Sequence, residues 1–254
     1  MNITGNTILI TGGGTGIGRG LAEALHAEGN TIVIAGRRRA PLEDVCAAND
    51  AMAWIELDVA DPADIARVAE KLAADHPALN VVVHNAGIMK AEDMTADPYD
   101  LAQAEATIAT NLLGPIRLTT ALLPQFKAQE SATIITVSSG LASVPLVYTP
   151  TYGATKAAIH SWSQSLRSQF DGTGIDVIEL VPPQVATDLM PGQVDDPGAM
   201  PLDAFIAEVI ALLKANPRGP EILVDKVKLL RNAEAEGRYD KTYAMLNANH
   251  RLAK

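Results

Sequence analysis

The chain has 254 residues, and 48% of them are hydrophobic, which is average for a globular protein and sufficient for a sizeable core. Its formal net charge is −10 and it has no long basic run, so we expect neither a nucleic-acid nor a membrane partner. Cys46 is the single cysteine, which excludes an internal disulfide and a cysteine metal site. Without a signal-peptide pattern or an apolar run of about 18 residues, the sequence predicts a cytoplasmic protein.

Short apolar runs rich in Val, Ile and Thr alternate with amphipathic segments along the chain. Continuously apolar runs are typical of parallel strands that are covered on both faces. We therefore predict a doubly wound parallel sheet of about seven strands in a three-layer α/β/α fold, the Rossmann type. The predicted strands are Thr7–Thr11, Thr31–Ala35, Ala53–Leu57, Asn80–Asn85, Ala132–Val137, Asp176–Val181 and Glu221–Val224.

Capping residues in the sequence also predict where helices begin and end. Gly29 closes the helical pattern that starts at Gly16, as a C-cap glycine does. Asp61 and Pro62 are typical of an N-cap and the first turn of a helix. No linker or low-complexity stretch divides the chain, so we predict a single domain over residues 1–254.

Two segments depart from this regular alternation. Residues 182–201 contain five prolines and little periodicity, and long loops of this kind often act as lids. We predict a lid over about residues 182–216, and the alternative is a disordered surface excursion. After the last predicted strand, residues 225–254 are charged and mostly helical in pattern, which predicts a helical tail.

The first predicted strand runs directly into a glycine-rich stretch that ends at Gly18. A strand, a glycine turn and a helix in this order can seat a phosphate on the helix N-terminus, although a purely structural turn is the alternative. The P-loop pattern fails because Arg19 and Gly20 follow Gly18, and G-x-G-x-x-G fails because Ile17 stands at its last glycine. The pattern that is present is T-G-x-x-x-G-x-G, starting at Thr11.

The end of the second predicted strand bears on the choice of dinucleotide. Folds that select NAD place an acid there for the ribose 2′-hydroxyl, whereas this chain has Gly36 followed by Arg37, Arg38 and Arg39. Arginine can bind a 2′-phosphate through charge-assisted hydrogen bonds. The sequence therefore favours NADP(H), with Arg37 as the main contact, and leaves NAD(H) possible. The alternative is that the three arginines bind no cofactor and only precede a solvent-exposed helix, although cations are disfavoured near a helix N-terminus.

Tyr152 and Lys156 are four residues apart in a predicted helix, so they share one face. An ammonium within ~4 Å stabilises a phenolate by roughly 4 kcal/mol at an effective dielectric of about 20. We therefore expect a lowered pKa for Tyr152 and a role as general acid/base. Ser139 follows the fifth predicted strand, where sites of open α/β sheets gather, and its hydroxyl can donate to a carbonyl oxygen. Ser138 is interpreted as a supporting residue.

Taken together and in this order, the motifs resemble those of the short-chain dehydrogenases/reductases over about residues 5–225. The resemblance implies that Ser139, Tyr152 and Lys156 are catalytic, and that Asn111 holds a water linking Lys156 to solvent. No metal is implied. It also implies a dinucleotide site formed by Tyr152 and Lys156 together with Gly12, Gly14, Thr15, Gly16, Ile17, Gly18, Arg37, Arg38, Asp58, Val59, Asn85, Ala86, Gly87, Pro182, Val185 and Thr187. Asp58 would meet the adenine, or alternatively cap the next helix.

The sequence departs from the family pattern in three places. His84 replaces the first asparagine of N-N-A-G, and a packed or hydrogen-bonded role is expected for it. Pro183 replaces the glycine of P-G-x-V-x-T and stiffens the start of the predicted lid. The charged tail replaces the short glycine-rich end of many members, so a homodimer is as plausible as the usual homotetramer.

The expected function is reduction of a small carbonyl compound, or oxidation of the alcohol, with NADP(H). An acyl-carrier-protein ketoreductase and a dinucleotide-sensing regulator are the alternatives. Asp188, Asp195 and Asp196 in the predicted lid argue against an acidic carrier, and both Tyr152 and Lys156 argue against a regulator without turnover. The pocket is expected within residues 89–99, 141–147 and 189–205, with an apolar lining from Met89, Leu141, Val144, Leu146 and Leu189.

Overall fold

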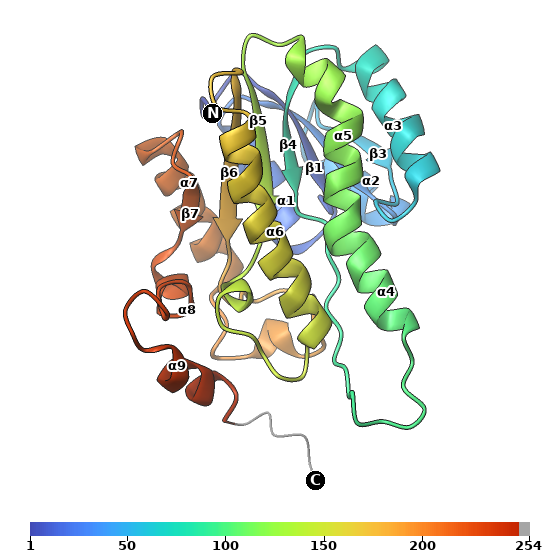
Figure 1. Ribbon diagram of the computed structural model, residues 1–254. Helices are drawn as coiled ribbons and strands as arrows, with labels where there is room; N and C mark the ends of the chain where they lie inside the picture. The colour runs from blue at the N-terminus through green and yellow to red at the C-terminus, as the bar shows by residue number, and fades with distance from the viewer. Residues whose placement is uncertain (249–254) are drawn as a thin grey trace.

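The computed structural model describes residues 1–248, and its centre is one sheet of seven strands (Figure 1). The strands follow the order β3-β2-β1-β4-β5-β6-β7, and all neighbours run parallel. The predicted doubly wound α/β fold is therefore confirmed, and the predicted strand ends are correct to within one residue. The observed strands are β1 Thr7–Thr11, β2 Thr31–Gly36, β3 Ala53–Glu56, β4 Leu79–His84, β5 Ala132–Val137, β6 Ile175–Val181 and β7 Glu221–Leu223.

Helices connect the strands, and their ends follow the signals in the sequence. The Asp61 carboxylate accepts a hydrogen bond of 2.8 Å from the amide of Ala63 and so caps α3. Helix α1 ends just before Gly29, whose amide donates to the His26 carbonyl at 2.9 Å. The helices are α1 Gly16–Ala27, α2 Arg39–Ala48, α3 Pro62–Asp75, α4 Ala102–Ile108, α5 Gly114–Lys127, α6 Pro150–Gln169, α7 Leu202–Ala215, α8 Lys228–Arg231 and α9 Tyr239–Leu246.

Two apolar cores, one on each face of the sheet, produce the three layers. Helices α1, α2 and α7 pack on one face, where Phe205 is fully buried in the same core as Leu21 and Leu25. Helices α3, α5 and α6 pack on the other, where Phe126 is the largest fully buried side chain. Figure 1 shows α5 and α6 in front of the strands and α1 behind them. Both faces are covered, which explains why the strands are almost continuously apolar.

The direction of winding reverses between β1 and β4. The chain proceeds from β1 outward to β3, returns to place β4 beside β1, and continues outward to β7. In open α/β sheets, ligands bind outside the carboxyl ends of the strands where the strand order reverses. The glycine turn after β1 and the N-A-G segment after β4 both lie at this point.

The predicted lid and tail have definite structures in the described residues. Residues 182–201 fold back on themselves, with hydrogen bonds of 2.8 Å from Ala186 to Met200 and from Met200 to Gln184. A disordered excursion is therefore wrong for this loop. The predicted bounds of the lid, 182–216, are also too wide, because residues 202–215 form α7, which packs on the sheet. The tail forms α8 and α9 as expected, and the predicted part from residue 249 onward lies outside the described residues. None of the helices within residues 1–248 has the length and hydropathy needed to span a bilayer.

We expect Phe205→Ala to lower the free energy of unfolding by about 3–5 kcal/mol, because the buried ring is lost and a cavity remains between α7 and α1. The measurement is urea denaturation. Val194→Ala serves as the control, since Val194 is 48% exposed, and we expect a change below about 0.5 kcal/mol for it. Equal losses in the two variants would contradict the assignment of Phe205 to the core.

Candidate active site

The glycine turn after β1 requires residues without a side chain. Gly12 has a φ of +67°, a left-handed conformation that favours glycine. A Cβ on Gly18 would lie 2.2 Å from the Gly12 carbonyl oxygen and 2.4 Å from Nδ2 of the Asn85 side chain. Helix α1 can therefore start directly beneath the turn only because Gly18 has no side chain. This leaves the first amides of α1 open toward the space above them.

Polar side chains join the ends of β1 and β4. The Thr11 hydroxyl accepts hydrogen bonds of 3.1 Å from the amides of Asn85 and Ala86, and donates to the Val83 carbonyl at 3.1 Å. The Asn85 side chain in turn donates to the Thr11 carbonyl at 2.9 Å. These bonds fix the glycine turn against the segment after β4, so both hold a constant position relative to any molecule bound above them.

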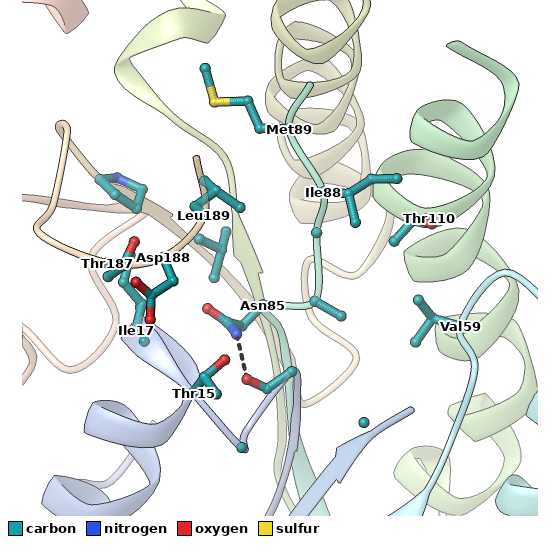
Figure 2. Close-up of a pocket in the computed structure, with 18 of the residues that line it drawn as sticks. Thr15, Ile17, Val59, Asn85, Ile88, Met89, Thr110, Thr187, Asp188 and Leu189 are labelled. Atoms are coloured by element: carbon teal, nitrogen blue, oxygen red, sulfur yellow. Dashed lines mark hydrogen bonds between the residues drawn. The ribbon is translucent and has the colours of Figure 1, made fainter. Parts of the chain in front are cut away.

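A cavity of about 640 Å³ opens above this junction (Figure 2). Its size is in the range of small-molecule and cofactor sites. Thr187, Asp188 and Leu189 line one side, and Ile88 and Thr110 line the opposite side. The residues predicted from the sequence that line it are Gly12, Gly14, Thr15, Gly16, Ile17, Arg37, Arg38, Val59, Asn85, Ala86, Gly87, Ser139, Tyr152, Lys156, Pro182, Val185 and Thr187.

Helix α6 brings Tyr152 and Lys156 to the wall of the cavity, beside Ser139 at the end of β5. All three side chains are buried. The Lys156 ammonium donates to the Val137 carbonyl at 2.8 Å and lies 5.6 Å from the centre of the Tyr152 ring. The lysine is thus held above the aromatic face by the last residue of β5.

The acidity of Tyr152 differs from the sequence-based expectation. Burial raises the pKa of Tyr152 to about 12, and a hydrogen bond with the Ser139 side chain opposes only part of this rise. Burial also lowers the pKa of Lys156 to about 8, against the opposing charge of Glu179. The expected lowering was wrong for these residues alone, because desolvation of the phenolate outweighs a lysine that faces the ring and the Val137 carbonyl.

Asn111 lies in a π-helical turn, Ala109–Leu113, between α4 and α5. Its side chain accepts from the Ile88 amide and donates to the Ile88 carbonyl, both at 2.9 Å. A longer bond of 3.3 Å reaches the Thr155 hydroxyl on α6. π-Turns are often found at functional sites, and this one orients Asn111 so that it joins the segment after β4 to the helix that carries Tyr152 and Lys156.

Comparison with known proteins identifies the family. The family model described as short chain dehydrogenase matches residues 6–197. An uncharacterised oxidoreductase of Bacillus subtilis, DltE, is 36% identical over 251 residues, covering 97% of this chain and 98% of that protein. The protein belongs to the short-chain dehydrogenase family. It is accordingly an NAD(P)-dependent oxidoreductase.

Solved structures agree with this assignment. A short-chain dehydrogenase from Sphingobium yanoikuyae in complex with NADPH has a TM-score of 0.78 and 26% identity, with 98% of each chain covered. A 3-ketoacyl-(acyl-carrier-protein) reductase from Brucella melitensis, complexed with NADH, has a TM-score of 0.76 and 25% identity, covering 85% of this chain and 93% of that one.

In this short-chain dehydrogenase, three residues of the predicted catalytic and dinucleotide site do not line the cavity, and neither do Leu141, Val144 and Leu146 of the predicted substrate pocket. Gly18 lies below the glycine turn, and Asn111 lies behind the wall, bonded to Ile88. Asp58 is turned into its own loop, where its carboxylate accepts from the Ala60 amide at 2.9 Å. Asp61 rather than Asp58 caps α3, so the capping alternative for Asp58 is wrong, whereas its contact with the adenine stays a prediction.

The structure also adds residues to the lining that the sequence analysis did not single out. Ile88 and Thr110 line it beside the predicted Gly87 and Asn111, so adjacency in the sequence was the available signal. Gln193 lines it from the lid, where its side chain donates to the Val185 carbonyl at 2.7 Å. Gln193 falls within residues 189–205, where the pocket is expected from the sequence, although no motif singled it out.

Two arginines after β2 line one end of the cavity. Arg37 and Arg38 line the cavity, are exposed, and form no ion pair or side-chain hydrogen bond within residues 1–248. Arg39, by contrast, bonds Glu43 at 2.8 Å and stacks on Trp54 with its guanidinium 5.3 Å from the ring centre. Arg37 and Arg38 thus remain free for an anion, and with the glycine turn they fit a phosphorylated dinucleotide.

Glu92 links the segment after β4 to the first turn of α6. Its carboxylate accepts from the Thr151 amide at 3.1 Å, the Thr151 hydroxyl at 2.6 Å and the Tyr99 hydroxyl at 2.9 Å. A carboxylate is favourable at a helix N-terminus, where amides are unpaired. Because Tyr152 directly follows Thr151, Glu92 fixes the backbone that carries the phenol.

His84 at the end of β4 is a packed residue, as expected. Its Nε2 lies 2.7 Å from the Thr119 hydroxyl on α5, and its ring centre lies 6.5 Å from that of Trp162. Burial lowers the pKa of His84 to about 3. The imidazole is therefore neutral in the folded protein across the physiological range.

We expect this burial to make the protein less stable in acid. The unfolded chain binds a proton at His84 below about pH 6.5, whereas the folded protein binds it only near pH 3, so stability falls between these values. The loss attributable to His84 is about 3 kcal/mol between about pH 6.5 and about pH 4. Urea denaturation of the parent and of His84→Asn at both pH values measures it. If the two proteins lost the same free energy on acidification, this account of His84 would be wrong.

Proposed function

We propose that the protein reduces a small ketone or aldehyde to the alcohol, or catalyses the reverse reaction, with NADP(H). The observation that carries the proposal is that buried Tyr152, Lys156 and Ser139 share one cavity with the glycine turn after β1. This arrangement supports binding of a dinucleotide across the turn, with its reactive end beside the phenol.

The bound nicotinamide supplies the hydride, and the chain's own side chains handle the proton and the oxygen. Since burial raises its pKa to about 12, Tyr152 is protonated at neutral pH, which is the form that donates a proton during reduction. We assign to Ser139 a hydrogen bond donated to the substrate oxygen, where negative charge develops. Lys156 is mainly protonated near about pH 7, and its ammonium stabilises the phenolate that remains.

Proton resupply is assigned to Asn111 and its surroundings. Asn111 is almost fully buried and holds Ile88 on one side and Thr155 on the other. We propose that it orders a water between Lys156 and solvent, as the family resemblance implies. The short distance from Asn111 to α6 supports this role, because Thr155 directly precedes Lys156.

The part of the cavity next to Tyr152, which we call the substrate end, has apolar residues that favour an apolar carbonyl compound as substrate. Met89 and Leu189 line the cavity, and Leu146, with half-buried Leu141, packs in the same cluster as Met89 and Tyr152. Val144 is fully buried outside this cluster. These apolar side chains would bind the substrate by burial of apolar surface, while Tyr152 and Ser139 fix the carbonyl.

Reduction of a ketoacyl thioester is a second candidate. The similarity to the Brucella melitensis 3-ketoacyl-(acyl-carrier-protein) reductase supports it. The acidic lid residues Asp188, Asp195 and Asp196 disfavour an acidic carrier protein at the cavity mouth. A ketoacyl thioester and simple ketones assayed together by nicotinamide absorbance distinguish the two candidates.

Domain organisation, oligomeric state and cellular location are the remaining properties of the enzyme. We propose a single catalytic domain that forms a homodimer or homotetramer in the cytoplasm. Met94, Leu101 and Ile108 expose apolar side chains in and before α4, which supports association through this region. Sedimentation equilibrium distinguishes the dimer from the tetramer.

We expect Tyr152→Phe to lower kcat by a factor of about 10²–10⁴, because the proton donor is removed while the ring remains. Steady-state assays with a series of ketones measure this, and we expect the Kd for NADPH, measured by fluorescence, to change far less than kcat. Tyr239→Phe is the matched control, since Tyr239 lies on α9 and stacks on Tyr243. Turnover of Tyr152→Phe at the parent rate would disprove the catalytic assignment.

We expect Arg37→Ala to raise the KM for NADPH about tenfold or more, because a charge-assisted hydrogen bond to the 2′-phosphate contributes about 1.5–3 kcal/mol. The KM for NADH should stay within about twofold, since NADH lacks that phosphate. Arg39→Ala is the control, because Arg39 is held by Glu43 and Trp54. An equal change in both KM values would count against Arg37 as the 2′-phosphate contact.

A further inference from the structure

The helical tail returns to the segment that connects the two main catalytic residues. After β7, the chain forms α8 and then α9, which ends at Leu246. In Figure 1, α8 and α9 lie beside the connection between β5 and α6, residues 138–149, which contains Ser139 and leads into the first turn of α6 with Tyr152. The tail therefore has direct access to the backbone of this connection.

Helix α8 packs on the first residue after Ser139. A Cβ on Gly140 would lie 2.8 Å from Leu230 Cδ1 and 3.0 Å from Val227 Cγ2. The Gly140 amide also donates to the Pro182 carbonyl at 2.9 Å. The start of the connection is thus confined between the tail and the start of the lid.

Asn247, directly after α9, holds the far part of the connection. Its side-chain oxygen accepts from the Val147 amide at 2.8 Å, and its nitrogen donates to the Pro145 carbonyl at 3.1 Å. The same nitrogen donates to the Tyr243 carbonyl of α9 at 3.0 Å. Both amide protons and the oxygen are therefore engaged, and the side chain is buried. One residue of the tail fixes two backbone groups of the connection.

Leu246 packs on the inner side of this contact. It lies against the apolar cluster of Met89, Leu146 and Tyr152, and both Met89 and Tyr152 line the cavity. The neighbouring Met245 is 55% exposed and is not part of this cluster. The tail thus supplies a second layer behind the apolar wall of the substrate end.

We propose that Leu246 and Asn247 are specificity-determining positions, which set the width of the substrate end by holding residues 144–148 behind Met89 and Tyr152. They act through the wall and do not contact the dinucleotide end, which lies at the glycine turn. The inference rests on the proposed carbonyl reduction at Tyr152. It predicts a change in preference between large and small ketones rather than a uniform loss of activity.

The first experiment changes the size of Leu246 in both directions. We expect Leu246→Ala to raise the ratio of kcat/KM for a bulky ketone over a small one by about tenfold, and Leu246→Phe to lower it, since a change of a few methylenes alters pocket preference on this scale. The KM for NADPH should be unchanged in both variants. Met245→Ala on the exposed side of α9 is the matched control, with the parent ratio expected.

The second experiment does not depend on turnover. We expect Asn247→Ala to speed hydrogen exchange at residues 144–148 by about tenfold or more, because the Val147 amide loses its acceptor, while Met245→Ala leaves the rate unchanged. A parent that reduces no carbonyl compound overturns the proposed function alone. If active Leu246 variants keep the parent ratio, or if exchange at 144–148 is unchanged in Asn247→Ala, the inference about the tail is overturned.

Discussion

The close approach of Gly18 to the Gly12 carbonyl and to the side-chain amide of Asn85 is the constraint on which the site depends. Only a residue without Cβ permits this contact, and it places the start of α1, the end of β1 and the segment after β4 within hydrogen-bonding distance of each other. The reversal of winding puts these parts side by side. Of the other side chains that line the cavity, Arg37 follows β2 and Ser139 follows β5 of the same sheet, whereas α6 carries Tyr152 and Lys156.

The sequence predicted those features that depend on local pattern. Continuous apolar runs located the strands, and Asp61 with Pro62 located the start of α3, because burial on both faces and helix capping are decided within a few residues. The spacing of Tyr152 and Lys156 placed them on one face of α6, and the cavity lining contains both. Periodicity and short motifs were sufficient for these results.

Features that arise from long-range packing were not predictable in the same way. The pKa of Tyr152 depends on how fully the fold removes it from water and on where the Lys156 ammonium finds its acceptor, and spacing reveals neither. The carboxylate of Asp58 bonds its own loop, which a motif match cannot indicate. Asn247 and the connection it holds are about 100 residues apart, so no pattern in the sequence relates them.

Glu92 couples two segments that are far apart in the chain. Because its carboxylate accepts three hydrogen bonds from Thr151 and Tyr99, the segment after β4 cannot move away from α6 without exposing the unpaired amides of the helix start. The two segments should therefore open as one cooperative unit with a shared opening free energy. A molecule that stabilises the segment after β4 would then rigidify the turn that carries Tyr152 at the same time, so its binding and the alignment of the proposed proton donor would be a single event.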